Sequence, residues 1–195
     1  MSQIFLSAGI PDDSGSEHFE SADPFLIQFA VRELLTVCLG RRVVVWGGHP
    51  AITPMVWAVC ESLGVDYASQ VRLYQSKQFE EWFPEANKRF KNVTFTPAVR
   101  NDRAASLEVM RRKMLSGPFG AAVFIGGMGG IFDEYRLFKE LNPMAKVLAV
   151  SAPGGASAKL AKQLRQRNIG IDFARLFHKK LGIAPTEPRD QALTR

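Results

Sequence analysis

Short apolar runs alternate with segments of helical spacing along this 195-residue chain. Six runs predict strands, and most of them are uniformly apolar, which is typical of strands that are buried on both faces of a sheet. These runs are residues 3–7, 42–46, 71–75, 93–96, 122–125 and 146–150. Strands of this kind, separated by helices, indicate a parallel sheet that helices cover on both sides. The pattern therefore predicts an α/β fold, a single doubly wound domain with a mainly parallel sheet of about six strands.

Helical periodicity fills most of the intervals between the predicted strands. It predicts helices over residues 24–39, about 51–63, 102–115, 131–138, 156–167 and 171–181. Asp23 and Pro24 are residues of the types that cap and open a helix. Residues 79–90 predict a short helix or an ordered loop, because Pro84 argues against one continuous helix. We expect one domain over residues 1–184 and a flexible C-terminal tail over residues 185–195.

Composition narrows the class of protein. Hydrophobic residues make up 46% of the chain, which is ordinary for a globular domain. No run of about 18 apolar residues occurs, so we expect no membrane span. The first residues carry no basic region of the kind that opens a signal peptide. Cys38 and Cys60 both fall inside predicted helices, which fits reduced thiols in a cytoplasmic protein.

The chain is basic, with 25 Lys and Arg residues against 19 Asp and Glu residues and a formal net charge of +6. This charge permits a phosphorylated ligand or a nucleic acid as partner. The basic residues are scattered, however, and no nucleic-acid-binding motif accompanies them. Solvated helix faces explain them better, so we do not expect nucleic acid as a partner.

Residues 121–135 combine a buried strand, a glycine-rich loop and the start of a helix. The loop consists of Gly126, Gly127, Met128, Gly129 and Gly130. Glycine lets the backbone approach a ligand closely, and the free N–H groups at a helix start attract an anion. This arrangement predicts a binding site for a phosphate-bearing ligand.

A second junction of the same type follows the second predicted strand, where Gly47, Gly48 and His49 precede a helix. Ser7 and Gly9 come at the end of the first strand, and the carboxyl ends of parallel strands meet at one edge of a sheet. We therefore expect these five residues to line one crevice together with the glycine-rich loop. The alternative for a single glycine turn is close packing of a helix on a strand. A lone histidine is likewise more often structural than a ligand or a base.

Charged residues near the glycine-rich loop supply candidate catalytic groups. Asp133 and Glu134 lie in the first turn of the helix after the loop, where a carboxylate that faces the crevice could act as a base or stabilise a cation. Adjacent helical positions diverge by about 100°, so only one of the two should face the site. Arg111 and Arg112 end the preceding helix and are candidates to bind phosphate. Favourable charge at a helix end is the alternative explanation for both pairs.

The sequence lacks the motifs of several other classes of binding site. The chain has neither the G-x-G-x-x-G fingerprint of NAD-binding domains nor a P-loop, so hydride transfer and P-loop chemistry are disfavoured. Two cysteines alone cannot make a zinc site, and no second histidine accompanies His49, so we expect no metal and no cofactor. Arg100 and Arg103 follow the fourth predicted strand and are further candidates to bind phosphate.

Two stretches resemble the paired glycine segments of lonely-guy phosphoribohydrolases and lysine-decarboxylase-like proteins. The first is VVVWGGHPAITPMV at residues 43–56. The second is MRRKML at residues 110–115, followed by VFIGGMGGIFDE at residues 123–134. The second stretch is similar to an Arg-Lys helix followed by a Pro-Gly-Gly-x-Gly-Thr-x-x-Glu loop. The likeness extends from Ile4 to about Leu164 and implies the SLOG superfamily of Rossmann-like nucleotide-binding domains.

The chain departs from the signature of these relatives at several positions. An isoleucine replaces the loop proline, and Gly130 replaces the threonine. Asp133 falls on the position of the catalytic glutamate, with Glu134 one residue later. The arginine of the signature maps to Arg112, or to Arg111 after a small gap.

The resemblance implies a nucleotide or phosphoribosyl ligand, with hydrolysis of its N-glycosidic bond if the protein is an enzyme. An arginine would then orient the ligand, and a carboxylate would activate water or stabilise the ribosyl cation. The alternative is a non-catalytic nucleotide-sensing module of a bacterial conflict or signalling system. A weaker alternative is a nucleic-acid-binding protein, suggested by the charge and by DNA-processing relatives with this fold. The resemblance also implies a homodimer with the site near the subunit interface.

Overall fold

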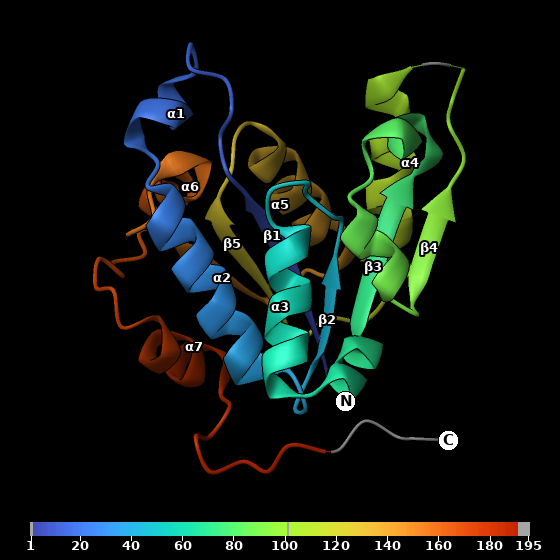
Figure 1. Ribbon diagram of the computed structural model, residues 1–195. Coiled ribbons are helices and arrows are strands. Elements are labelled where there is room, and N and C mark those ends of the chain that lie inside the picture. The colour runs from blue at the N-terminus through green and yellow to red at the C-terminus, as the bar shows by residue number, and fades with distance from the viewer. Residues whose placement is uncertain (1, 101, 191–195) are drawn as a thin grey trace.

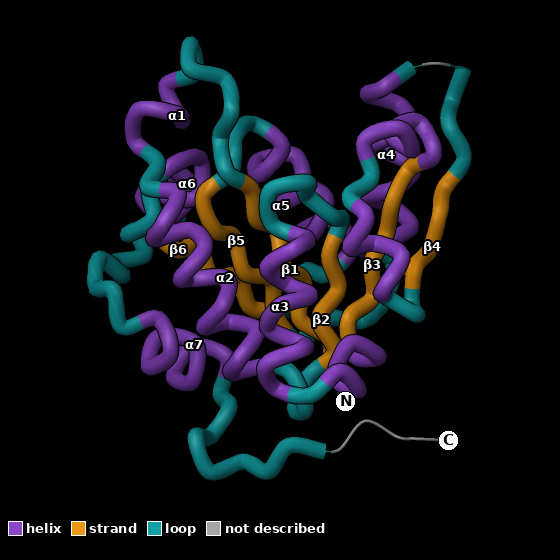
Figure 2. Tube along the Cα trace, viewed as in Figure 1, coloured by secondary structure: helices purple, strands orange, loops and turns teal. Residues whose placement is uncertain are grey.

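The computed structural model describes residues 2–100 and 102–190 as three layers, with one sheet between two sets of helices (Figure 1). All strands of the sheet are parallel: β1 (Gln3–Gly9), β2 (Val43–Trp46), β3 (Val71–Ser76), β4 (Val93–Thr96), β5 (Ala121–Gly126) and β6 (Lys146–Val150). Their order across the sheet is β4-β3-β2-β1-β5-β6 (Figure 2). The chain therefore runs from β1 outward to one edge, crosses to the other side of β1 and continues to the opposite edge. This confirms the predicted doubly wound, Rossmann-like α/β fold.

Helices cover both faces of the sheet. The α-helices of the described residues are α1 (Glu17–Ser21), α2 (Pro24–Cys38), α3 (Thr53–Leu63), α4 (Arg103–Leu115), α5 (Gly130–Leu141), α6 (Gly155–Gln163) and α7 (Phe173–Leu181). The first apolar core, which contains Leu6, joins the sheet to α2, α3 and α7. The second core, which contains Phe5, joins the other face to α4, α5 and α6. Because successive strand residues point to opposite faces, a strand buried on both sides, such as β5, is apolar throughout.

Local sequence explains where α2 begins. The side chain of Asp23 accepts hydrogen bonds from the backbone N–H groups of Phe25 at 2.9 Å and Leu26 at 3.0 Å. Pro24 occupies the first helical position, where no intrahelical donor is needed. The predicted cap is thus present, and the helix ends at Cys38, one residue before the predicted end.

α6 ends at Gln163, four residues before its predicted end. The residues that follow form hydrogen bonds with β6, at the edge of the sheet. The side chain of Gln166 accepts a hydrogen bond from Ala149 N at 3.0 Å and donates to Val147 O at 2.8 Å. The side chain of Asn168 donates to Ala149 O at 2.9 Å. These amides pair with backbone groups of the edge strand β6, which would otherwise be open to another chain.

Other elements differ from the predictions in smaller ways. α1 was not predicted; it is five residues long, and the Ser16 side chain caps it. α7 begins at Phe173 rather than two residues earlier, because Asp172 caps it by accepting from Arg175 N at 3.0 Å. The segment around Pro84 forms 3-10 helices, namely η2 (Lys77–Trp82) and η3 (Glu85–Arg89), and η1 (Val65–Gln70) precedes β3. Within the described ranges, none of the helices has the length and apolar character needed to cross a membrane.

The last described residues, 185–190, make polar contacts with the domain. Arg189 Nη2 donates a hydrogen bond to Thr36 O, near the end of α2, at 2.6 Å. Arg42 Nη1 donates to Glu187 Oε1 at 2.5 Å. The rest of the predicted tail lies outside the described residues, so its flexibility stays a prediction.

Candidate functional site

The carboxyl ends of β1, β2 and β3 border a cavity of about 320 Å³. The strand order reverses on either side of β1, and ligands of doubly wound sheets bind at such a switch point. The lining residues come from these strand ends, from the loops after β2 and β3, and from α4 and α5. They are Leu6, Ser7, Ala8, Trp46, Gly47, Gly48, His49, Pro50, Gln75, Ser76, Phe79, Trp82, Phe83, Pro84, Leu107, Met110, Arg111 and Glu134.

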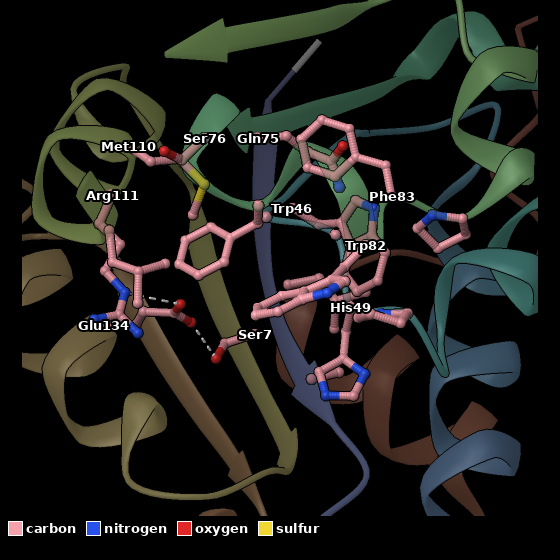
Figure 3. A pocket seen from close by; sticks show the side chains of 18 residues that line it. Ser7, Trp46, His49, Gln75, Ser76, Trp82, Phe83, Met110, Arg111 and Glu134 are labelled. Atoms are coloured by element: carbon pink, nitrogen blue, oxygen red, sulfur yellow. Dashed lines mark hydrogen bonds and ion pairs between the residues drawn. The ribbon is translucent and has the colours of Figure 1, made fainter. Parts of the chain in front are cut away.

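A serine, an arginine and a glutamate form a polar cluster on one side of the cavity (Figure 3). Ser7 Oγ donates a hydrogen bond to Glu134 Oε2 at 2.5 Å. Arg111 Nε donates to Glu134 Oε1 at 3.2 Å. The side chains of Arg111 and Glu134 are only 13% and 18% exposed. Each carboxylate oxygen of Glu134 therefore has its own donor, and the carboxylate is held in a fixed orientation.

The sequence neighbours of Glu134 and Arg111 point away from the cavity. The side chain of Asp133 is 51% exposed; it pairs with Arg136 Nη2 at 3.0 Å and more loosely with Arg111 Nη1 at 3.6 Å. Arg112 is half exposed and pairs with two glutamates on the outer surface of α4 and α5. The helical geometry thus places Arg111 and Glu134 in the cavity wall and leaves Asp133 and Arg112 outside it.

The loop after β2 contributes Gly47, Gly48 and His49 to the cavity lining, at the strand end where the sequence predicts them. Gly48 has a φ of +73°, and a Cβ there would lie 2.5 Å from Gln75 Nε2, so a glycine is required. Burial lowers the pKa of His49 below its usual value, and the nearby Asp12 carboxylate opposes this shift. His49 Nδ1 accepts from the N–H of the second residue after it at 3.3 Å, which leaves Nε2 to carry the proton of the neutral ring.

Packing explains Gly126, the last residue of β5, and Gly127, the first residue after it. Gly126 and Gly127 have φ values of +61° and +71°. A Cβ at Gly126 would lie 2.5 Å from Ile27 Cδ1, and one at Gly127 would lie 2.6 Å from Ile131 Cγ1. Gly127 N also donates to Gly9 O at 2.7 Å. None of these three glycines lines the cavity among the described residues, although Gly9 lies between the loop and His49.

The rest of that loop leads into α5 beside the polar cluster. A Cβ at Gly129 would meet no atom within 4 Å, so the space next to it is open. A Cβ at Gly130 would lie 2.9 Å from Arg111 Nη2, so this glycine makes room for the guanidinium. Met128 is partly buried. Gly130 thus adjoins the cavity through Arg111, and none of Met128, Gly129 and Gly130 lines the cavity in the described structure.

A family model matches residues 17–181 of the chain. The chain belongs to the SLOG cluster3 family. The match includes both glycine segments, Arg111 and Glu134, and begins after Ser7. The comparisons with curated proteins and with solved structures gave no match. Membership of a SLOG family indicates nucleotide-related binding and confirms the SLOG domain that the sequence predicts.

The sequence did not reveal the aromatic side of the cavity in this SLOG domain. Phe79 and Trp82 belong to η2 and Phe83 follows it, while Met110 comes from α4. Figure 3 shows Trp82 and Phe83 across the cavity from Glu134. The available signal was a cluster of aromatic residues among charges, in a segment without periodicity. Such apolar surfaces with a few polar groups are typical of sites that bind a heterocycle.

Two arginines that the sequence suggested as phosphate ligands are placed differently. The Arg103 guanidinium lies 4.6 Å from the ring centroid of Trp82 and 5.4 Å from that of Phe79, in cation–π geometry. Arg103 therefore supports the aromatic side of the cavity. Arg100 is exposed, with a φ of +42°. Neither arginine is among the described residues that line the cavity of the SLOG domain.

The described part of the SLOG domain holds no group of three or more His, Cys, Asp or Glu residues placed to bind a metal ion. Cys38 and Cys60 are buried free thiols, and burial raises the pKa of each to about 12. Thiols with such pKa values are poor nucleophiles at neutral pH. The chemical groups of the site include the Glu134 carboxylate with its two donors, the neutral His49 ring and the amide of Gln75.

Proposed function

We propose that this SLOG domain binds a nucleotide or a nucleotide-derived phosphoribosyl compound in the cavity and hydrolyses its N-glycosidic bond. The observation that carries the proposal is Glu134, a carboxylate held by Ser7 and Arg111 in a cavity with an aromatic opposite side. The aromatic residues offer a surface on which a base can stack. The carboxylate offers the group that glycoside-cleaving enzymes place beside the bond they break.

In this proposal the base lies against Trp82 and Phe83, and the ribose lies beside Glu134. The phosphate lies at the start of α5, where the open space beside Gly129 supports close approach to backbone N–H groups. Arg111 is already paired with carboxylates and supplies no spare positive charge. Phosphate binding therefore relies on the backbone amides and on the dipole of α5.

The fixed carboxylate of Glu134 has a defined role in the proposed reaction. As the bond between the base and the anomeric carbon breaks, positive charge develops on the ribosyl group. A carboxylate beside that carbon stabilises the charge, and Ser7 and Arg111 prevent the carboxylate from turning away. The oxygen of water then forms a bond to the anomeric carbon, and the proton that this water loses balances the proton that the leaving base takes up on its nitrogen.

The test is a screen of nucleoside monophosphates and NAD-derived nucleotides, scored for thermal shift and for released free base. We expect at least one nucleotide to raise the Tm of the wild-type protein and to lose its base. Glu134→Gln should keep the thermal shift and lose base release, because the amide carries no negative charge. Asp133→Asn, at the exposed neighbouring position, is the matched control and should keep both. A wild-type protein that responds to no nucleotide would contradict the proposal.

The same contacts favour one second function, a sensor module that binds the nucleotide without turnover. Both oxygens of Glu134 already accept hydrogen bonds, so the carboxylate has limited capacity to act as a base. A thermal shift without base release in the wild-type protein identifies the sensor. Salt-dependent binding to DNA, with no response to nucleotides, identifies the nucleic-acid-binding alternative.

We also propose that the protein is a homodimer in the cytoplasm. The family resemblance supports the dimer, and Ile169 and Ile171, which are 86% and 61% exposed before α7, offer apolar surface. The buried free thiols of Cys38 and Cys60 fit a reducing compartment. Sedimentation that shows only a monomer at micromolar concentration would contradict the dimer.

A further inference from the structure

Gln75 places a buried amide in the cavity, away from the polar cluster of Ser7, Arg111 and Glu134. It lies in β3, one residue before the strand ends, and lines the cavity although the residue is only 5% exposed. Figure 3 shows it on the side of Phe83 rather than on the side of Glu134. A buried amide needs hydrogen-bond partners, so its contacts decide what it can offer a ligand.

The oxygen of this amide is already occupied. Asn87 Nδ2 donates a hydrogen bond to Gln75 Oε1 at 2.7 Å, and Asn87 is itself only 6% exposed. This bond turns the Gln75 oxygen toward η3, while the Oδ1 atom of Asn87 is buried and has no hydrogen-bond partner among the described residues. A glutamine with its oxygen held in this way presents its NH2 group to whatever lies on the other side.

The nitrogen of the amide lies at the cavity. Gln75 Nε2 donates no hydrogen bond to a protein group among the described residues. It is nevertheless not one of their completely buried polar atoms. It therefore keeps contact with solvent, and the cavity that Gln75 lines supplies this contact. It also lies against Gly48, because a Cβ at that glycine would come within 2.5 Å of it. The NH2 group of Gln75 thus offers a hydrogen-bond donor to a ligand in the cavity, beside Gly48.

The geometry points to Gln75 as the residue that selects the base, by donating a hydrogen bond to a carbonyl oxygen of the heterocycle. This inference rests on the proposed function, since it assigns the edge of the base to the aromatic side of the cavity. A carbonyl oxygen accepts from the amide, whereas an exocyclic amino group would face it donor to donor. A buried donor left without an acceptor loses the hydration that it had in the free protein. The site should therefore prefer oxo-bases to amino-bases.

Two matched ligand pairs test this preference. Inosine monophosphate and adenosine monophosphate differ at the edge that carries an oxo or an amino group, and uridine and cytidine monophosphate differ in the same way. Isothermal titration with the full-length wild-type chain should give the oxo member of at least one pair an affinity at least about tenfold higher, which corresponds to roughly 1.4 kcal/mol. If both pairs bind with equal affinities, or if the amino members bind more tightly, the inference is overturned.

Variants at Gln75 separate this role from packing. Gln75→Glu replaces the donor by an acceptor and should lower or reverse the oxo-to-amino affinity ratio. Gln75→Met keeps the length of the side chain without the polar group and should bring the ratio close to one; it decides the matter if the glutamate variant fails to fold. Gln70→Met is the matched control, because Gln70 is a buried glutamine that accepts from Gly40 N at 2.6 Å outside the cavity. It should lower stability and leave the ratio unchanged.

The outcomes distinguish this inference from the proposed function. If the wild-type protein binds nucleotides and Gln75→Met keeps the wild-type ratio, Gln75 does not select the base, and the proposed function stands. If the wild-type protein binds none of the four nucleotides, the proposed function fails for these ligands and the inference fails with it. If Gln70→Met changes the ratio as much as Gln75→Met does, the effect comes from general destabilisation, and the inference is overturned.

Discussion

At the scale of single residues, the site depends on which of two neighbours faces the cavity. The sequence narrows the acid to Asp133 or Glu134 and the arginine to Arg111 or Arg112, because adjacent helical positions point in different directions. It does not fix the choice, since that depends on the rotation of α4 and α5 on the sheet. In the structure, Ser7, two residues before the end of β1, contacts Glu134, and this contact spans 127 positions of the chain.

The first prediction concerns the pH dependence of stability at His49. Burial lowers the pKa of His49 in the folded protein, whereas the unfolded chain keeps a value of about 6.5. Between these two values the unfolded state binds a proton that the folded state does not bind, so this group lowers stability as the pH falls through about 6.5. His49→Gln removes the contribution. The Tm difference between wild type and His49→Gln should therefore shift in favour of the variant as the pH falls from about 7.5 to 5.

Thermal unfolding of both proteins at several pH values checks this sign. A Tm difference that stays constant over the range, or that shifts in favour of the wild-type protein on acidification, would show that His49 is not held in its neutral form.

At the scale of elements, one glycine-rich loop serves two purposes that the sequence does not separate. Gly127 has a positive φ and lies against Ile131, so packing requires it. Gly129 has a helical φ of −50° and open space around it. Both are glycines in the same run, and their difference follows from the path between β5 and α5. A glycine pattern can therefore predict the loop, while the structure is needed to say which glycine a ligand can approach.

The second prediction compares alanine substitutions at these two glycines. Gly127→Ala places a Cβ in left-handed backbone and against Ile131, so it should lower the free energy of unfolding by about 1–2 kcal/mol or more. Gly129→Ala should leave stability unchanged or raise it by up to about 1 kcal/mol, because alanine restricts the unfolded chain. Chemical denaturation of the two variants and of the wild-type protein measures both effects. Equal loss at the two positions would contradict the separation.

Secondary structure was predictable where the apolar pattern is strong, and it failed where a tertiary contact decides. All six strands occur at the predicted places, and the pattern is strongest in strands such as β5, which is apolar and buried throughout because helices cover both of its faces. The end of α6 was missed, since Gln166 and Asn168 leave the helix to bond the edge strand, and no periodicity signals such a contact. The sequence likewise assigns no role to the aromatic residues of η2, because no periodicity signals their contact with the cavity.

At the scale of the whole molecule, the topology decides where the cavity lies. The parallel strands bring Ser7, Gly48 and Gln75 to one edge of the sheet, as the alternation of strands and helices predicts. The aromatic side of the cavity depends on how the chain crosses between β3 and β4, which the sequence pattern leaves open. Away from the cavity, the last described residues contact the C-terminal end of α2.

The last prediction tests whether this C-terminal attachment stabilises the domain. Arg189 donates hydrogen bonds to Thr36 O and Leu39 O, at the C-terminal end of α2. The last carbonyl groups of a helix lack intrahelical partners, and the negative end of the helix dipole lies there. Arg189→Ala should therefore lower stability by about 1 kcal/mol, which is a fall in Tm of about 2–4 °C for a protein of this size.

Arg167→Ala is the control, because Arg167 is exposed and makes no hydrogen bond or ion pair among the described residues. It should change the Tm by less than about 1 °C, since surface substitutions away from such contacts have small effects. Differential scanning calorimetry of the full-length variants measures both. If the two variants unfold at the same temperature, the hydrogen bonds of Arg189 add nothing to the stability of the domain, and the prediction is wrong. A loss confined to Arg189→Ala moves the start of the tail beyond that residue.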